Sequence, residues 1–174
     1  TKYAVGPRKE LAVRTMFNLL GPLTNPAETP NQVMGIFSKQ WVLTAAEVLK
    51  KLGSRHVMVV HSADGMDEIS LADATHVAEL KGGEINEYMI EPEDFDIERQ
   101  SVDELVVENA EQSLAIIQKA LSGEPGPAAD ILALNAGAAI YVADRAKTLP
   151  EGVKKAQQIL QSGDLFRSIL DKHR

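Results

Sequence analysis

Residues 31–60 read NQVMGIFSKQWVLTAAEVLKKLGSRHVMVV, and three patterns in this stretch decide the fold class. Residues 31–37 form a short β-branched and apolar run, which predicts a buried strand. Apolar side chains then recur at 3.6-residue spacing between Ser38 and Gly53, which predicts a helix that Ser38 caps and Gly53 ends. The continuous apolar run at residues 56–60 is typical of a parallel strand with helices on both faces. Strand, helix and strand together predict a βαβ unit and an α/β fold. The expected apolar face of the helix consists of Trp41, Ala45, Val48, Leu49 and Leu52.

Residues 75–90 predict a β-hairpin whose turn is Gly82-Gly83, because glycine adopts positive φ at little cost. We expect this hairpin as an excursion at the edge of the sheet. Residues 91–108 carry eight acidic side chains with little periodicity, which favours a solvated loop over a cation site.

The last third of the chain has the pattern of helices. Asn109 has the character of an N-cap, and Gly123 ends the helix that follows it. Pro127 suits the first turn of the next helix. That second helix is so rich in Ala and Gly around Asn135 and Gly137 that we expect it to be buried and in close contact with a neighbour. The expected apolar face of the first helix consists of Ala110, Leu114, Ile117 and Leu121.

Length and composition limit the classes of function. At 174 residues the chain fits one domain, which would bury roughly 70% of its unfolded surface. The net charge of −7 disfavours non-specific nucleic-acid binding. The absence of Cys excludes disulfides, thiolate nucleophiles and Cys-ligated metal centres. No apolar run approaches the ~20 residues of a membrane span, so we expect a cytoplasmic protein without membrane contact.

The segment HSADGMDEISL, residues 61–71, is the strongest candidate for chemistry. It directly follows the second predicted strand, and ligands of open α/β sheets bind beyond the carboxyl ends of parallel strands. Its three carboxylates, Asp64, Asp67 and Glu68, are the kind of ligand that Mg²⁺ combines with water and substrate phosphate. The pattern alone leaves a magnesium site and a solvated turn open.

Two other groups of residues carry weaker signals. Arg8 and Arg14 could each hold a carboxylate or phosphate through two hydrogen bonds, but taken alone each fits a surface residue or a structural salt bridge. A nucleophilic triad of His61, Ser62 and Asp64 is disfavoured, because adjacent side chains of an extended segment point apart.

Two long motifs, RTMFNLLGPLTNP at residues 14–26 and HSADGMDEISL at residues 61–71, occur in order and precede an LNAGAAIYV helix. With these motifs the chain resembles the anthranilate phosphoribosyltransferases from residue 1 to its end. The resemblance covers only the C-terminal half of that family. It implies that residues 1–174 are the C-terminal portion of a single, truncated α/β domain of the parallel-sheet phosphoribosyltransferase and nucleoside phosphorylase type.

The family's N-terminal helical domain and glycine-rich pyrophosphate loop have no match in the sequence. We therefore expect the chain alone to be inactive, and to associate with itself or with a partner chain.

The resemblance also implies an activity. Enzymes of this family transfer the phosphoribosyl group of phosphoribosyl pyrophosphate (PRPP) to the amine of anthranilate, with Mg²⁺, and release pyrophosphate. Matching residue by residue, Asp67 and Glu68 would hold Mg²⁺ and Arg8 would bind the anthranilate carboxylate, whereas Arg14 fits a structural role better. The full-length protein would be a homodimer.

Three other interpretations compete with this one. Pyrimidine nucleoside phosphorylases resemble this fold, but the chain has no match to their phosphate-binding motifs. A related group that binds nucleic acid differs at residues 14–26, and the net charge of −7 also disfavours it. The third interpretation is a non-enzymatic interaction domain with an acidic loop.

Overall fold

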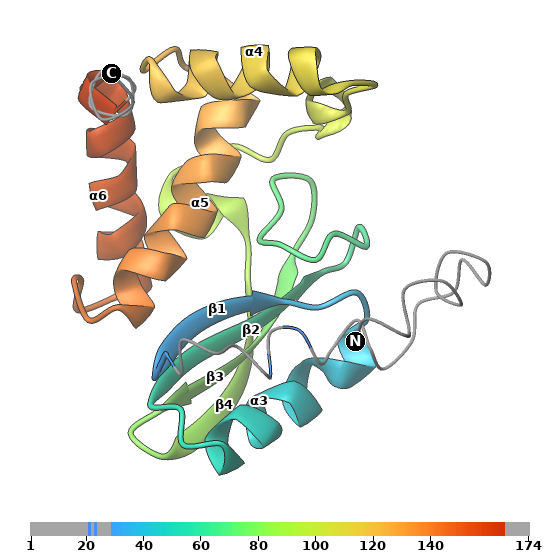
Figure 1. Cartoon of the computed structure of the whole chain (residues 1–174), viewed down its shortest axis with the longest axis vertical. Coiled ribbons are helices and arrows are strands. Elements are labelled where there is room, and N and C mark those ends of the chain that lie inside the picture. Colours follow the sequence, from blue (N-terminus) through green and yellow to red (C-terminus); the bar gives the residue numbers. More distant parts are fainter. Residues whose placement is uncertain (1–20, 22, 24–28, 166–174) are drawn as a thin grey trace.

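Four strands form one mixed sheet in the order β1-β2-β3-β4 (Figure 1). The computed structural model describes residues 21, 23 and 29–165. Only the β1–β2 pair is parallel, with Met34 opposite Val59, and the other two pairs are antiparallel. The α/β class is confirmed. The strands are β1 (Asn31–Gly35), β2 (His56–Ser62), β3 (Thr75–Lys81) and β4 (Glu84–Ile90).

The crossover from β1 to β2 contains a short 3₁₀ turn, η2 (Lys39–Trp41), and the helix α3 (Val42–Lys51). The predicted βαβ unit is therefore confirmed, and Gly53 ends the helix with a φ of 89°. The predicted apolar face is wrong at its two ends, because Trp41 and Leu52 are exposed. Trp41 belongs to the 3₁₀ turn, whose tighter winding puts its side chain out of phase with the helix, and Leu52 lies beyond the last helical residue. The helical residues that are buried are Val42, Ala45, Ala46 and Leu49.

The hairpin of β3 and β4 is confirmed and contributes the two outer strands on one side of the sheet. Gly82 and Gly83 form its turn with φ values of 61° and 83°. Because β3 pairs with β2 along seven residues, the hairpin continues the sheet that the βαβ unit begins.

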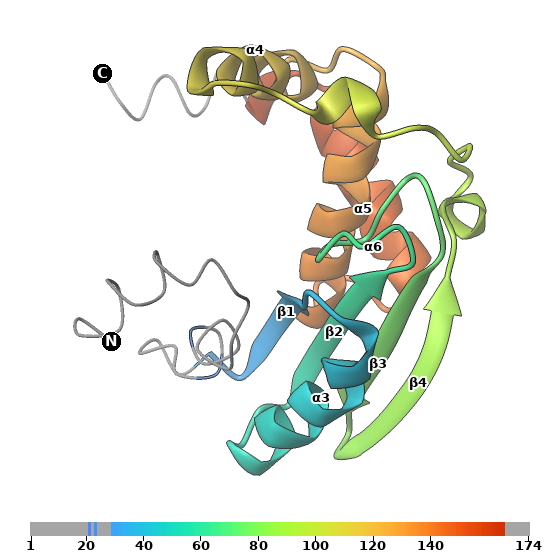
Figure 2. The ribbon, with the colours of Figure 1, turned by 90° about the vertical axis from the view of Figure 1, so that its right-hand side faces the viewer.

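Helices follow residues 91–108, here called the acidic segment, in the last third of the chain. This segment contains two 3₁₀ turns, and its Arg99 forms ion pairs with Glu91 and Glu93. In both views α4 lies at the opposite end of the molecule from α3 (Figures 1 and 2). The elements are η3 (Pro92–Phe95), η4 (Asp103–Leu105), α4 (Ala110–Leu121), α5 (Pro127–Val142) and α6 (Leu149–Gln161).

Two apolar clusters lie on the two faces of the sheet. Side chains that alternate along β2 separate them: Val57 and Val59 pack with α3, whereas Met58 and Val60 pack with α5. This alternation explains why the whole strand is apolar.

α5 and α6 are in backbone contact, as the small residues of α5 predicted. A Cβ added to Gly137 would collide with the Cα of Val153, and one added to Gly152 would collide with the Gly137 carbonyl oxygen. Glycine is therefore required where the two helices cross.

Asn109 caps α4 as predicted, since its Oδ1 accepts a hydrogen bond of 2.9 Å from the Gln112 amide. The prediction that the apolar face of α4 is buried is wrong. Leu114 is 54% and Ile117 49% exposed, because α4 packs on α5 through its Ala120 side instead.

His56 joins three elements at the end of the sheet opposite the carboxyl edge of β2. Its side chain is 4% exposed and faces carboxylates on both sides, with Nε2 3.0 Å from Glu79 and Nδ1 3.1 Å from Asp144. Glu79 also accepts hydrogen bonds from the hydroxyl groups of Tyr88 and Tyr141. Burial and the nearby Glu79 raise the pKa of Tyr88, so its hydroxyl stays a donor. His56 is thus placed in a buried polar cluster far from the candidate site.

Within residues 21, 23 and 29–165, no helix is both long and apolar enough to span a membrane.

Candidate functional site

The candidate site is the loop of residues 63–74, here called the carboxylate loop, which connects β2 to β3. Because β1 and β2 are parallel, their carboxyl ends meet at one edge of the sheet, and the loop begins there. His61 ties the two strand ends together, since its Nδ1 donates a hydrogen bond of 2.8 Å to the Ile36 carbonyl oxygen. The loop therefore occupies the position that the sequence predicted for chemistry.

Asp64 shapes the carboxylate loop from within. Its carboxylate accepts hydrogen bonds from the Met66 amide, at 2.9 Å, and from the Ser70 hydroxyl. Partial burial acts to raise the pKa of Asp64, but the hydrogen bonds from Ser70 and Met66 hold it below its ordinary value. Asp64 is therefore an ionised structural residue whose oxygens are already occupied.

Asp67 and Glu68 are both exposed residues of the loop. Their carboxylates form no hydrogen bond or ion pair with any other residue that the structure describes. Partial burial, and then the negative charge of Asp67, raise the pKa of the Glu68 carboxyl group. The two carboxylates thus repel one another without a neutralising partner among the described residues.

Two residues outside the loop hold this acidic pair in place. The Asp67 carbonyl rests against Gly35 of β1, where an added Cβ would overlap that oxygen. On the other side, Asn135 of α5 donates to the Ile69 carbonyl oxygen at 2.9 Å and accepts from the Ile69 amide at 3.0 Å. Neither contact was predicted from the sequence, although a lone Asn among the small residues of a buried helix was a signal of a required polar contact.

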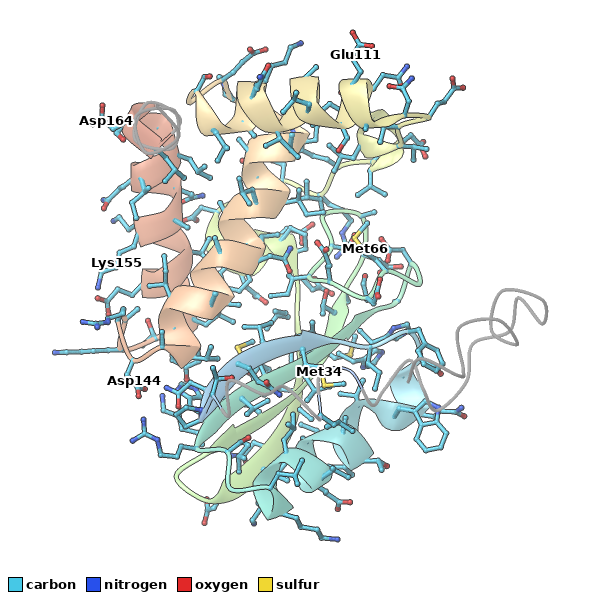
Figure 3. The ribbon with its side chains drawn as sticks, viewed as in Figure 1. Met34, Met66, Glu111, Asp144, Lys155 and Asp164 are labelled. Atoms are coloured by element: carbon cyan, nitrogen blue, oxygen red, sulfur yellow. The ribbon has the colours of Figure 1, made fainter. Side chains whose placement is uncertain are left out.

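The acidic pair borders a groove of about 700 Å³ between the carboxylate loop, α4 and α5. Figure 3 shows Met66, the residue before the pair, between the strands and α4. Most of the groove wall is apolar, and Asp67 and Glu68 are its acidic residues. The groove residues from the helices are Ile116, Ile117, Ala120, Leu121, Ala128, Ile131, Leu132 and Asn135.

The structure does not assemble the disfavoured triad. The His61 ring binds the Ile36 carbonyl, the Ser62 hydroxyl donates to the Ala74 carbonyl, and Asp64 binds Ser70. Arg8 and Arg14 lie outside the described residues.

The residues present fit a magnesium ion. Mg²⁺ binds proteins through one or two carboxylates and fills its octahedron with water and substrate phosphate. Asp67 and Glu68 supply two carboxylates that have no partner among the described residues. This donor set suits an ion shared with a phosphorylated substrate better than a fully protein-ligated ion.

Comparison with known proteins identifies the class. The model of the α/β domain of the glycosyl transferase family matches residues 1–165, and the chain belongs to that family. More particularly, the chain is similar to the anthranilate phosphoribosyltransferase of Marinomonas sp. (strain MWYL1). The two are 62% identical over 164 residues, which are 93% of this chain and 47% of that relative. The resemblance drawn from the two motifs is confirmed.

Solved structures agree with this relationship. The anthranilate phosphoribosyltransferase of Thermus thermophilus is 38% identical, with a TM-score of 0.88 over 98% of this chain and 50% of that chain. The enzyme of Saccharomyces cerevisiae in complex with PRPP and Mg is 26% identical, with a TM-score of 0.79 over 92% of this chain and 47% of that one. The chain spans about half the length of the curated relatives that it matches.

Partial burial and the neighbouring charge of Asp67 together predict an unusual titration of Glu68. We expect Glu68 to protonate above the ordinary glutamate pKa of about 4.3, so that it loses its charge at a higher pH than other glutamates as the pH falls. Asp67→Asn should move the Glu68 midpoint downward but not fully back, because partial burial remains. The NMR chemical shift of the Glu68 side-chain carboxyl group, followed against pH, measures the midpoint in the parent and in the Asp67→Asn variant.

Asp73→Asn is the matched control, because Asp73 belongs to the same loop but pairs with Arg99. It should leave the Glu68 midpoint unchanged. A Glu68 midpoint at or below the ordinary value would contradict the geometry of the pair.

Proposed function

We propose that this chain contributes the metal and acceptor-binding groups of an enzyme that transfers the phosphoribosyl group of PRPP to the amine of anthranilate. The single observation that carries the proposal is the Asp67–Glu68 pair at the carboxyl edge of β2, whose carboxylates have no partner among the described residues. The names of the relatives support it, since they share this chain's sequence at up to 62% identity. We also propose that residues 1–174 are the C-terminal portion of one α/β domain.

The reaction sets clear physical requirements. A bond forms between the amine nitrogen and C1 of the ribose, the bond from C1 to the pyrophosphate oxygen breaks, and the nitrogen loses a proton. An aromatic amine is a weak nucleophile, so catalysis depends on positioning and on electrostatic stabilisation of the developing charges. The positive charge develops on the ribose and the negative charge on the departing pyrophosphate.

Asp67 and Glu68 serve the pyrophosphate side of this reaction. They would hold Mg²⁺, which when bound offsets the negative charge of the pyrophosphate. No described residue neutralises these carboxylates, which favours a bound cation, and partial burial together with the charge of Asp67 raises the pKa of Glu68.

Arg8 would serve the acceptor side. Its planar guanidinium can donate two parallel hydrogen bonds to a carboxylate, and anthranilate carries a carboxylate next to its amine. The assignment rests on the match of the motif GPRKELAVRT to the family, with Arg14 kept as a structural residue.

The wider properties are also proposals. We propose a cytoplasmic enzyme that binds these two small molecules, forms a homodimer at full length and binds neither nucleic acid nor membranes. The net charge of −7 supports the exclusion of nucleic acid.

The activity can be tested in a chimera in which this chain replaces the matching half of the Marinomonas relative, assayed for phosphoribosyl transfer to anthranilate. Asp67→Asn with Glu68→Gln should lower kcat/KM for PRPP about a hundredfold or more, because two charged contacts of roughly 1.5–3 kcal/mol each are lost. The Mg²⁺ concentration needed for half-maximal rate should rise in the same variant.

Glu91→Gln with Glu93→Gln is the control, since it removes the same charge from the acidic segment and should change neither value. A parent chimera without transfer activity would refute the proposed function. Unchanged Mg²⁺ dependence in the Asp67–Glu68 variant would refute the metal assignment alone.

Arg8→Ala in the same chimera should raise KM for anthranilate about ten- to a hundredfold, from the loss of roughly 1.5–3 kcal/mol in charged hydrogen bonds. KM for PRPP should change little, and Lys9→Ala should leave both values unchanged. Steady-state kinetics with each substrate varied in turn provide the measurement. An equal loss for both substrates would show damage to the fold instead of a role in acceptor binding.

A further inference from the structure

Asn135 joins α5 to the carboxylate loop through both ends of its side-chain amide. Its Nδ2 donates hydrogen bonds to the carbonyl oxygens of Ile69, at 2.9 Å, and Ile131, at 3.0 Å. Its Oδ1 accepts a hydrogen bond of 3.0 Å from the Ile69 amide. Both N–H donors and the acceptor are therefore used. The orientation of the amide follows, because a flipped amide would place an N–H donor against the Ile69 N–H.

Ile69 needs these contacts because of where it lies. Its side chain is 3% exposed, and buried backbone N–H and C=O groups require partners. Since β2 ends at Ser62 and β3 begins at Thr75, the backbone of Ile69 lies outside the hydrogen-bond ladder that pairs the two strands. Asn135 supplies both partners, as a residue of a paired strand would.

The acidic pair immediately precedes Ile69 in the chain. On its other side, the Asp67 carbonyl is packed against Gly35 of β1. The backbone from Asp67 to Ile69 is thus held between a strand and a helix, and Asp67, Glu68 and Asn135 all border the same groove. A shift of α5 or a loss of the amide would move the carboxylates without removing them.

We propose that Asn135 is a positioning residue for the Asp67–Glu68 pair. By fixing the backbone of Ile69, it holds the two carboxylates at the groove in advance, so that binding of a divalent cation and a phosphorylated ligand does not have to order the loop. The inference rests on the proposed function, because the cation belongs to that function. Asn135 acts through the backbone and touches no reacting atom.

The test uses the chimera described above, which supplies the pyrophosphate loop that has no match in this sequence, and a cation that can be observed directly. Mn²⁺ binding is measured by electron paramagnetic resonance with pyrophosphate as the second ligand, and amide hydrogen exchange at Ile69 is measured by NMR. Asn135→Ala and Asn135→Leu both remove the amide, but they change the side-chain volume by different amounts. Each should weaken Mn²⁺ binding about tenfold and speed exchange at Ile69, while the amides of β2 keep their protection.

Two comparisons separate positioning from general stability. Asn86→Leu makes the same change at an exposed position of β4 and should alter neither reading. In a chain that already carries Asp67→Asn and Glu68→Gln, Asn135→Ala should weaken Mn²⁺ binding no further, because nothing remains to be positioned.

The outcomes are distinguishable. The Asn135 variants could show faster amide exchange at Ile69, or a lower melting temperature, and still bind Mn²⁺ as tightly as the parent does. That result would overturn the positioning role and leave the proposed function intact. A parent chimera that does not bind Mn²⁺ would overturn the metal assignment and the inference together. Asn135→Ala decides the matter if the leucine variant fails to fold, because alanine favours the middle of a helix.

Discussion

The parallel pairing of β1 with β2 is the constraint on which the remaining structure depends. It requires a crossover, which α3 provides on one face of the sheet, and it leaves the other face of β2 to α5. It also brings the carboxyl ends of both strands to one edge. The chain that leaves β2 must then cross that edge to enter β3, and this crossing is the carboxylate loop. The position of the site follows from the strand pairing before any functional residue is considered.

The electrostatics of the loop divide its carboxylates by role. Asp64 accepts hydrogen bonds and is held ionised, so its charge serves the loop's own conformation. Asp67 and Glu68 receive no such support from the described residues, and partial burial together with the charge of Asp67 raises the pKa of Glu68. Carboxylates with perturbed pKa values are frequent at functional sites, and a cation with bound pyrophosphate is the ligand that we propose for this pair.

Local sequence signals predicted much of the fold because the interactions behind them are local. The βαβ unit followed from the apolar run of β2 and the helical periodicity of α3, and the hairpin followed from Gly82-Gly83. The failure at α4 arose because tertiary packing decides which of its faces is buried. The apolar side chains Leu114 and Ile117 have helical spacing, but only the position of α5 determines which side of α4 is covered.

The acidic pair was predicted from its position after β2, whereas its supports were not. Gly35 lies far from Asp67 in the chain, and its requirement for glycine becomes visible only when the loop is seen against β1. Asn135 is 66 residues from Ile69, so no local pattern links them. Sequence reasoning can name the groups that carry chemistry, but the contacts that orient them come from the assembled fold.

The most direct measurement of the central claim is the position of a bound ion. Crystals of the chimera grown with PRPP and Mn²⁺ would locate the ion by its anomalous scattering. The account predicts an ion coordinated by at least one carboxylate oxygen of Asp67 or Glu68 and by oxygens of the pyrophosphate group, at about 2.0–2.2 Å, close to the Mg²⁺ distance. An ion bound with PRPP but out of reach of both carboxylates would contradict it.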